Sequence, residues 1–272
     1  MMRALWTAAS GMIAQQTNVD NIANNLANVN TTGYKTSTAE FKTLLYQTIQ
    51  TKTTTANGEN KPTAAQVGLG VRNSSITTHF TQGPIQASDN DFAFAIEGDG
   101  FFAVRGSDGE TYYTRNGDFR IALASDNTMM LCTTDGYPVL DEDGAPIILS
   151  SEYKAEKLVV SNDGEIFYPD ENNNLQSLGI KIGLYQFTNP AGLENRSGTL
   201  FATTDASGAA VEEGSNPELK ASKLNQGCLE ASNVQVVDEM VNLITAQRAY
   251  EMNSKAIQAA DDMLSQANQL KR

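Results

Sequence analysis

The sequence has very little of the chemistry on which most enzyme and metal sites depend. Its 272 residues include two cysteines, one histidine and one tryptophan. Cys132 and Cys228 lie far apart in unlike surroundings, which is neither a metal-ligand spacing nor a disulfide framework, so we interpret both as small buried or half-buried hydrophobic residues. His79 lacks the partners that a catalytic triad or a histidine-based metal site requires, and we interpret it as an ordinary surface or core residue.

Positive charge is also scarce, because the formal net charge is −13. Binding to nucleic acid through phosphates needs a basic surface, and anionic membranes attract basic segments, so neither partner is expected. Residues 1–60 hold four basic and three acidic side chains, and residues 232–272 hold four and five, so the middle carries the whole net charge. Neutral ends and a charged, solvated middle indicate that the ends contact other molecules.

A long hydrophobic run is missing as well. No segment approaches the roughly 18 apolar residues of a membrane span. Residues 1–3, Met-Met-Arg, followed by residues 4–14, have some likeness to a short signal peptide. Polar residues interrupt that stretch, however, and its apolar periodicity continues to Val29. We therefore expect neither a cleaved signal peptide nor a membrane anchor.

The N-terminal stretch repeats an apolar pattern every seven residues, as the seam of a coiled coil does. The two seam positions hold Leu5, Met12, Val19 and Leu26, and Ala8, Gln15, Ile22 and Val29. Between residues 4 and 29 the only charged side chain is Asp20. Amides supply most of the polarity, among them Gln15, Gln16, Asn24, Asn25 and Asn28. This composition suits a helix that forms hydrogen bonds with neighbours on several sides. Asn30 and Gly33 are predicted to end it, because both tolerate the left-handed conformation beyond a last turn.

The C-terminal stretch carries the same repeat. Its seam holds Val236, Leu243, Tyr250, Ile257 and Leu264, with Ala246, Ala260 and Ala267 in the companion position and Asn253 as a polar interruption. Residues 232–235, Ser-Asn-Val-Gln, have the form of a capping box in which Ser232 caps the helix. A helix over 232–270 would be about 58 Å long, which exceeds what a compact domain of this size can cover.

The two heptad stretches stand at opposite ends of the chain. The simplest arrangement pairs them and loops the middle out sideways. One alternative is a private two-helix hairpin within a monomer, and the other is burial between many subunits. The second is favoured, because a two-helix pair leaves much of each helix exposed and the N-terminal stretch lacks the charges that a solvated helix carries.

The middle of the chain predicts β structure. Short runs rich in β-branched and aromatic residues occur at 92–96, 101–104, 111–114, 119–121, 128–131, 157–160, 165–168 and 180–187. Turn dipeptides punctuate them: Asp99-Gly100, Asp108-Gly109, Asn116-Gly117, Asp135-Gly136, Asp143-Gly144 and Asp163-Gly164. We therefore expect an α+β fold, in which N- and C-terminal helices form a coiled coil and a mostly antiparallel β domain, over roughly 85–205, is inserted between them. The polar stretch 48–66 is expected to be mobile in the free subunit.

The remaining candidate sites are weak. Residues 141–144, Asp-Glu-Asp-Gly, come closest to a calcium loop, but the run is too short and lies between predicted strands, so a hairpin turn is favoured. A carboxylate pair for glycoside hydrolysis is always imaginable among 32 acidic residues and carries no information. Residues 68–70, Gly-Leu-Gly, have no lysine after them and are not a phosphate loop. We expect no catalytic residues, no metal and no cofactor, and we interpret the chain as a protein that is not an enzyme.

Two terminal motifs carry a family resemblance. The first is residues 23–35, Ala-Asn-Asn-Leu-Ala-Asn-Val-Asn-Thr-Thr-Gly-Tyr-Lys, and the second comprises 230–234, 239–244 and 247–251. Residues 96–102 and 113–117 resemble motifs of the β domain that belongs to the same family. Together these motifs are similar to those of the flagellar rod and hook proteins, and the resemblance covers essentially the whole chain.

Within that family the distal rod subunits are most similar, on residues 45–49 and 68–72, although the interval between these segments departs from their pattern. A proximal rod or hook-type paralogue is the alternative, and a secreted β-rich binding module is a further one that leaves the terminal helices unexplained. The resemblance implies a structural subunit that polymerises into a tubular drive shaft and transmits torque. It also implies export through the flagellar type III apparatus, contact with neighbouring rod and hook proteins, and a place in the basal body beyond the inner membrane, in the periplasm or cell wall.

We expect four parts: a helix and turn over 1–45, an extended, partly flexible rod segment over 46–84, a β-rich outer domain over 85–231 and a helix over 232–272. The terminal segments are expected to be largely disordered in the free subunit, because isolated heptad helices are marginal without partners. The expected assembly interface comprises Leu5, Met12, Val19, Ile22, Asn24, Asn25, Leu26, Asn28, Val29, Gly33, Ser232, Asn233, Val236, Leu243, Tyr250, Ile257 and Leu264.

Overall fold

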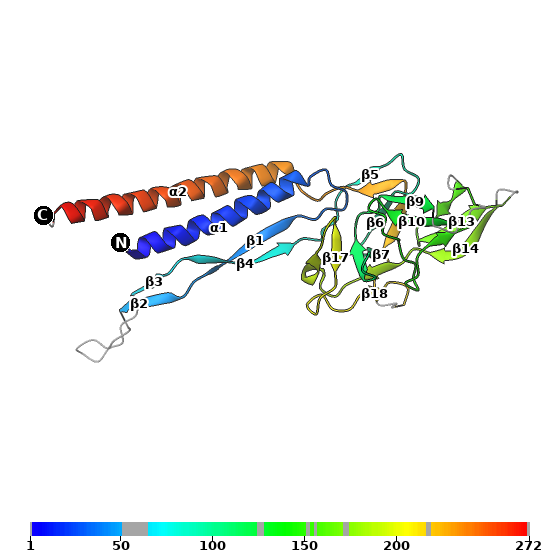
Figure 1. Ribbon diagram of the computed structural model, residues 1–272, viewed down its shortest axis with the longest axis horizontal. Coiled ribbons are helices and arrows are strands. Elements are labelled where there is room, and N and C mark those ends of the chain that lie inside the picture. The colour runs from blue at the N-terminus through cyan, green and yellow to red at the C-terminus, as the bar shows by residue number, and fades with distance from the viewer. Residues whose placement is uncertain are drawn as a thin grey trace. The chain divides into compact units, whose positions relative to one another are not determined.

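The computed structural model describes residues 2–50, 65–123, 128–150, 153–154, 157–170, 174–215 and 219–270, which form two compact units (Figure 1). Unit 1 comprises Met1–Ala27, Ser37–Thr78 and Gln235–Arg272, and unit 2 comprises Asn28–Thr36 and His79–Val234. The chain therefore passes between the units four times. Most of the stretch 48–66, which was expected to be mobile, lies outside the described residues.

Unit 1 contains the two long helices that the heptad repeats predict. Helix α1 spans Met2–Ala27 and helix α2 spans Val236–Gln269. The helices lie side by side (Figure 1). They approach so closely at Gly11 that a Cβ atom there would lie 2.9 Å from Nδ2 of Asn253. Small side chains elsewhere on the two helices are buried, namely Ala8, Ala14, Ala246 and Ala260.

Both predicted helix ends were wrong. Helix α1 ends at Ala27, well before Gly33, and helix α2 begins at Val236 with Gln235 at the N-cap and no side-chain cap. The hydroxyl of Ser232 instead accepts a hydrogen bond from the backbone N–H of Val234 at 3.3 Å. The physical reason is that the segments which flank the helices belong to unit 2, and a longer helix would break their hydrogen bonds there. Helix α2 is thus 34 residues long, which corresponds to about 51 Å.

Two antiparallel strand pairs complete unit 1. Strand β1, Ser37–Thr43, pairs with β4, Val71–Thr78, and β2, Tyr46–Gln50, pairs with β3, Ala65–Gly68. Strands β1 and β4 contact α1. The chain approaches α1 closely at Gly70. Only glycine fits there, because a Cβ atom at this position would lie 2.2 Å from Oγ of Ser10. Ser10 Oγ accepts a hydrogen bond from the Val71 N–H at 3.3 Å.

Unit 2 is built from short antiparallel strands, as the sequence predicts, and the α+β class is thereby confirmed. Its strands are β5 Ile85–Ala87, β6 Phe94–Glu97, β7 Phe101–Arg105, β8 Thr111–Thr114, β9 Phe119–Leu123, β10 Met129–Thr133, β11 Ile148–Leu149, β12 Val159–Val160, β13 Glu165–Pro169, β14 Leu175–Lys181, β15 Leu184–Gln186, β16 Glu194–Asn195, β17 Leu200–Ala202, β18 Val211–Glu212, β19 Lys223–Gln226 and β20 Cys228–Glu230, with a 3-10 turn, η2, at Pro190–Gly192. The largest sheet has the order β16-β17-β8-β7-β15-β18. Smaller sheets follow the orders β11-β10-β9, β12-β13-β14, β19-β6 and β20-β5.

The core of unit 2 lies on both faces of β7. Successive side chains of a strand point to opposite faces, so Phe101 and Phe102 enter different hydrophobic clusters. Phe102 packs edge-to-face on Phe119, with ring centroids 4.9 Å apart, and Phe101 packs in the same way on Phe187 at 5.4 Å. Cys132 is buried and Cys228 half-buried, and both are free, which confirms their interpretation as small hydrophobic residues.

Four of the six predicted turn dipeptides carry a glycine with positive φ. These are Gly109, Gly136, Gly144 and Gly164, with φ of +83°, +86°, +75° and +85°. The other two predictions of hairpins were wrong, because β6 does not pair with β7 and β8 does not pair with β9. Gly117 serves a different purpose: a Cβ atom there would lie 1.8 Å from the carbonyl oxygen of Phe94.

The predicted strand over 180–187 is also divided, since β14 ends at Lys181 and β15 begins at Leu184. The break lies at Gly183, where a Cβ atom would be 2.5 Å from the carbonyl oxygen of Asp141. A continuous strand with a side chain at this position would therefore collide with the neighbouring backbone.

Candidate assembly surface and buried ionic cluster

The predicted seam residues of α1 and α2 are covered to very different degrees. Ile22 is buried, whereas Val236 and Tyr250 are 39% and 43% exposed. The half-buried members of the seam are Leu5, Met12, Val19, Leu26, Leu243, Ile257 and Leu264. One subunit therefore covers only part of its own seam and leaves apolar surface on both helices.

A second apolar face of α2 was missed by the seam analysis. It consists of Val237, Met240, Val241 and Ile244, whose side chains are 73%, 51%, 54% and 52% exposed. Their spacing of three and four residues places them on one side of the helix. We call this set the α2 apolar row. The spacing of these residues can be recognised in the sequence, but the seven-residue repeat predicts only the neighbouring face of the helix.

A groove runs beside the seam where the helices meet. Gln16, Val19, Gln247, Tyr250 and Glu251 line a cavity of about 380 Å³. Its walls come from both helices of unit 1. Its lining combines Val19 and Tyr250 with two amides and one carboxylate, a mixture that is common where a surface packs against another protein element.

The amides of α1 are partly used within the chain. Nδ2 of Asn21 and Nδ2 of Asn25 both donate to the carbonyl oxygen of Ser37, at 2.6 and 2.8 Å. Oδ1 of Asn25 accepts from the Ser37 N–H at 3.0 Å. Asn25 therefore fixes the start of β1 against α1, and sequence reasoning missed the same role for Asn21. Asn24 is exposed on the surface of α1.

A buried carboxylate lies in the first turns of α2. Glu239 is 8% exposed, and its Oε2 finds no hydrogen-bond partner within the described part of the chain. Its position is the companion seam position, seven residues before Ala246. The positive end of the helix dipole favours a carboxylate here. A single polar residue in a helix seam specifies register at a cost in stability.

Unit 2 contains a buried ionic cluster formed by Lys35, Arg115 and Glu230, which are 2%, 2% and 1% exposed. Lys35 Nζ lies 2.6 Å from Glu230 Oε1, and Arg115 Nε lies 3.3 Å from Glu230 Oε2. The three residues are far apart in the sequence, and the fold brings them together. The cluster holds two cations and one anion, so the position of Glu230 between them is essential to its stability.

Backbone carbonyls stabilise the second positive charge of this cluster. Both terminal nitrogens of Arg115 donate to the carbonyl of Gly98, at 2.8 and 2.9 Å, and one donates to that of Gly100. The guanidinium also lies 5.5 Å from the centre of the Phe101 ring. Burial and the Arg115 charge lower the pKa of Lys35, while Glu230 opposes that shift.

Gly33 and Asn233 lie beside the cluster. The N–H of Gly33 donates to the carbonyl oxygen of Glu230 at 2.9 Å. Oδ1 of Asn233 accepts from the N–H of Thr36 at 2.7 Å and from its hydroxyl at 2.6 Å. Of the other predicted interface residues in unit 2, Ser232 is buried, and Asn28 and Val29 are half-buried. Gly33 and Asn233 thus join distant segments of unit 2, a role that sequence reasoning did not assign to them.

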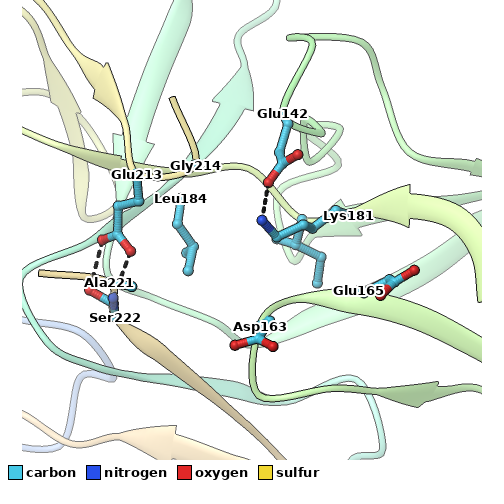
Figure 2. Close-up of a pocket in the computed structure, with 10 residues that line it drawn as sticks. Glu142, Asp163, Glu165, Lys181, Leu184, Glu213, Gly214, Ala221 and Ser222 are labelled. Carbon is cyan, nitrogen blue, oxygen red and sulfur yellow. Dashed lines mark hydrogen bonds and ion pairs between the residues drawn. The ribbon is translucent and has the colours of Figure 1, made fainter. Parts of the chain in front are cut away.

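Unit 2 contains a cavity of about 340 Å³, and four of its ten lining residues are acidic: Glu142, Asp163, Glu165 and Glu213 (Figure 2). Figure 2 shows Glu142 paired with Lys181, and Glu213 bonded to Ser222. Glu165 accepts from the Ser177 hydroxyl. These carboxylates are thus engaged in structural contacts. The described residues contain no group of three or more His, Cys, Asp or Glu side chains that could hold a metal ion.

None of the helices formed by the described residues is long and apolar enough to cross a membrane. Residues 5–35 match the family model "Flagella basal body rod protein", and residues 95–168 match the D1 domain of the flagellar hook protein FlgE/F/G. Residues 225–270 match the C-terminal part of the flagellar basal body rod FlgEFG proteins.

The chain belongs to the flagellar basal-body rod protein family. It is 45% identical to the flagellar basal-body rod protein FlgG of Borreliella burgdorferi, over 100% of both chains. It is 42% identical to the FlgG of Caulobacter vibrioides, over 99% of this chain and 100% of the relative, and 42% identical to that of Agrobacterium fabrum, over 97% of each. Similarity over the full length of these relatives extends the family assignment to both units.

Proposed function

We propose that this protein is a structural subunit of the distal rod of the flagellar basal body and that it polymerises through its terminal helices. The observation that carries the proposal is the α2 apolar row, beside a family match that includes both helices. Burying the exposed half of such a side chain contributes about 1 kcal/mol, so the four residues together contribute roughly 4 kcal/mol to each contact between subunits. We propose a second copy of this chain as the occupant.

Pairing of α1 and α2 as a coiled coil is part of the same proposal. Leu5, Met12, Val19 and Leu26 would then interlock with the seam of α2. Close-packed helices deform little, so a tube of such pairs resists twisting and can transmit torque. Register between neighbouring pairs would come from polar seam residues such as Glu239 and Asn253.

The other parts of the rod subunit follow from this assembly. We propose the division 1–45, 46–84, 85–231 and 232–272 for the assembled protein, with the acidic β domain outside and the neutral helices inside. Neighbouring rod and hook proteins contact the ends of the homopolymer. Export through the flagellar apparatus without a cleaved signal would place it beyond the inner membrane. A proximal rod or hook-type role within the family is the alternative.

The protein would act in this assembly without catalysing a reaction. The second unit's acidic cavity offers the most enzyme-like arrangement of carboxylates, yet Glu142, Glu165 and Glu213 each have a structural partner there. A general acid needs a proton held near neutral pH and free access to a substrate.

The proposal is tested by placing charge in the α2 apolar row. Purified parent protein, Val241→Asp/Ile244→Asp and the control Gln258→Asp are concentrated and examined by sedimentation and electron microscopy. The control changes an exposed polar residue of the same helix. Parent and control are expected to form tubular polymers, and the double variant is expected to stay monomeric with a folded unit 2. Normal polymers from the double variant would contradict the proposal.

A further inference from the structure

The chain enters or leaves unit 2 at four places, and all four lie in one region of that unit. These passages follow residues 27, 36, 78 and 234. Their ends in unit 2 are the segments 28–36, 79–84 and 228–234, which we call the root segments. Each root segment is hydrogen-bonded to both of the others, so one small region collects every connection to unit 1.

Three side chains make most of these connections. Lys35 donates to the Thr81 carbonyl at 2.8 Å and pairs with Glu230, whose Oε1 also accepts from the Gly83 N–H at 2.9 Å. Nδ2 of Asn233 donates to the Thr81 carbonyl at 3.1 Å and to its hydroxyl at 2.8 Å. Lys35, Glu230 and Asn233 thus each link their own root segment to a different one.

Regular secondary structure contributes little to this junction. Residues 28–36 contain no strand, and β20 pairs with β5 over three residues only. Two backbone bonds tie residues 28–36 to the other root segments, from the Gly33 N–H to the Glu230 carbonyl at 2.9 Å and from the His79 N–H to the Thr36 carbonyl at 2.8 Å. Lys35 and Asn233 add four side-chain bonds between residues 28–36 and the other two root segments.

We propose that Lys35, Glu230 and Asn233 form a clasp that holds the root segments of α1 and α2 together and so promotes pairing of the two helices within one subunit. Helix α1 ends just before the first root segment, and α2 begins just after the last. The clasp therefore replaces a long chain connection by a short one. This inference rests on the proposed role of paired helices in the rod.

The expected effect follows from the entropy of loop closure. Without the clasp, the helices are joined through residues 28–235. With the bonds from Thr36 to Asn233 in place, they are joined through 28–36 and 233–235. The probability that two chain ends meet falls with the 3/2 power of the number of linking residues, which makes the ratio roughly 70-fold. This ratio is an upper limit. The sheets of unit 2 stay folded when the clasp is broken, so the effective connection between residues 28 and 235 is shorter than the full chain.

A disulfide between the helices measures their pairing directly. The reporter protein carries Gly11→Cys and Asn253→Cys, with Cys132 and Cys228 replaced by alanine. A Cβ atom on Gly11 would lie 3.2 Å from Cγ of Asn253, so the two new thiols fall within the range of a disulfide. Equilibration of dilute monomer with reduced and oxidised glutathione gives the effective concentration of one thiol at the other.

The clasp is weakened by Lys35→Met/Asn233→Ala in this reporter. Neither residue belongs to the hydrophobic clusters of unit 2, and near-ultraviolet circular dichroism checks that the variant keeps its β core. The matched control is Glu194→Gln, which removes the exposed ion pair with Arg196 in the same unit. The effective concentration is expected to fall toward the 70-fold limit in the clasp variant and to remain unchanged in the control.

Hydrogen exchange at the amides of Gly33, Thr36 and Gly83 reports whether the clasp has opened. Faster exchange together with a large fall in effective concentration supports the inference. A fall smaller than about threefold, the effect of one doubling of loop length, would overturn it. Unchanged exchange in the variant would overturn it too, because these side chains would then not hold the roots.

Failure of the clasp and failure of the proposed function are separable. Polymerisation of the protein without new cysteines is measured in parallel. If polymers form but the effective concentration is the same with and without the clasp substitutions, only the inference about the clasp is wrong. If no condition yields polymers, the proposed function is wrong, whatever the disulfide measurement shows.

Discussion

Replacement of Gly33 by alanine is expected to destabilise unit 2 strongly. Gly33 has φ of +70°, in the left-handed region that side chains disfavour. A Cβ atom there would also lie 2.6 Å from the backbone nitrogen of Asn116 and 2.8 Å from the carbonyl carbon of Arg115. Backbone atoms cannot swing away as a flexible side chain does, so the first root segment would have to move.

The magnitude is a sum of two terms. The left-handed conformation costs an alanine roughly 1–2 kcal/mol, and overpacking in a well-filled site costs roughly 1–3 kcal/mol. The free energy of unfolding of unit 2 should therefore fall by about 2–5 kcal/mol. A loss of this size is a large fraction of the stability of an ordinary domain.

Two other glycines allow the cost of the left-handed conformation and the cost of the collision to be measured separately. Gly136→Ala tests conformation alone, because its φ is +86° and its added Cβ would meet nothing within 4 Å. Gly183→Ala tests the collision alone, since its Cβ would lie 2.5 Å from the Asp141 carbonyl oxygen and it has no positive φ. Each single term is expected to destabilise less than Gly33→Ala does.

Urea unfolding measures all three variants. Seven of the nine tyrosines lie in unit 2, so tyrosine near-ultraviolet circular dichroism follows that unit, whereas the fluorescence of Trp6 follows unit 1. A stability loss for Gly33→Ala no greater than that for Gly136→Ala would refute the reasoning. It would mean that the root segment shifts freely and is not held against Asn116.

Three further predictions concern charge, pH and assembly. Glu230→Gln should destabilise unit 2 by about 3–5 kcal/mol in urea unfolding, because it leaves the buried cations Lys35 and Arg115 without their carboxylate. Lys35→Met should destabilise it clearly less, because Arg115 and Glu230 remain as an ion pair with no net charge. Equal losses would contradict this prediction. Burial, with the neighbouring Tyr185, raises the pKa of Tyr113 to about 12. The folded state thus keeps a proton that the unfolded chain releases, so stability is intact below pH 10 and declines by about 2–3 kcal/mol between pH 10 and 12. In urea unfolding, the stability of Tyr113→Phe should decline less over this range, and what remains comes from Tyr112 and Tyr185, whose pKa values are also raised. An identical decline would exclude Tyr113 as a source. Leu26→Asp should leave unit 2 folded by circular dichroism but abolish polymers in electron micrographs; normal rods would oppose the seam proposal.

The helices and the fold class could be predicted from the sequence, because a repeating local pattern specifies them. A seven-residue period can be recognised without knowledge of distant contacts, and aspartate-glycine turns fix their own conformation. The ends of the helices were not predictable in the same way. Ser232 and Gln235 satisfy the rule for a capping box, yet the hydrogen bonds of Asn233 in unit 2 require that the chain enter the helix later.

The ionic cluster could not be predicted from spacing. Lys35 and Glu230 are separated by 195 residues, and only the folded sheet brings Arg115 to them. The available signal was a single charged residue, Lys35, in the first terminal motif and a single one, Glu230, in residues 230–234 of the second. Gly33 was recognised for its left-handed conformation, which its φ of +70° confirms, whereas its close approach to the backbone of Asn116 could not be predicted from the sequence.

The junction of the root segments also bears on how this kind of subunit can change size. Every connection between the units passes through residues 28–36, 79–84 and 228–234, and the strands of unit 2 beyond them are linked by surface turns. Loop insertions between β9 and β18 would enlarge unit 2 but leave the spacing of the helix roots unaltered. The β unit could therefore change in size while the two helices keep a constant geometry, and an engineered peptide could be inserted there for display.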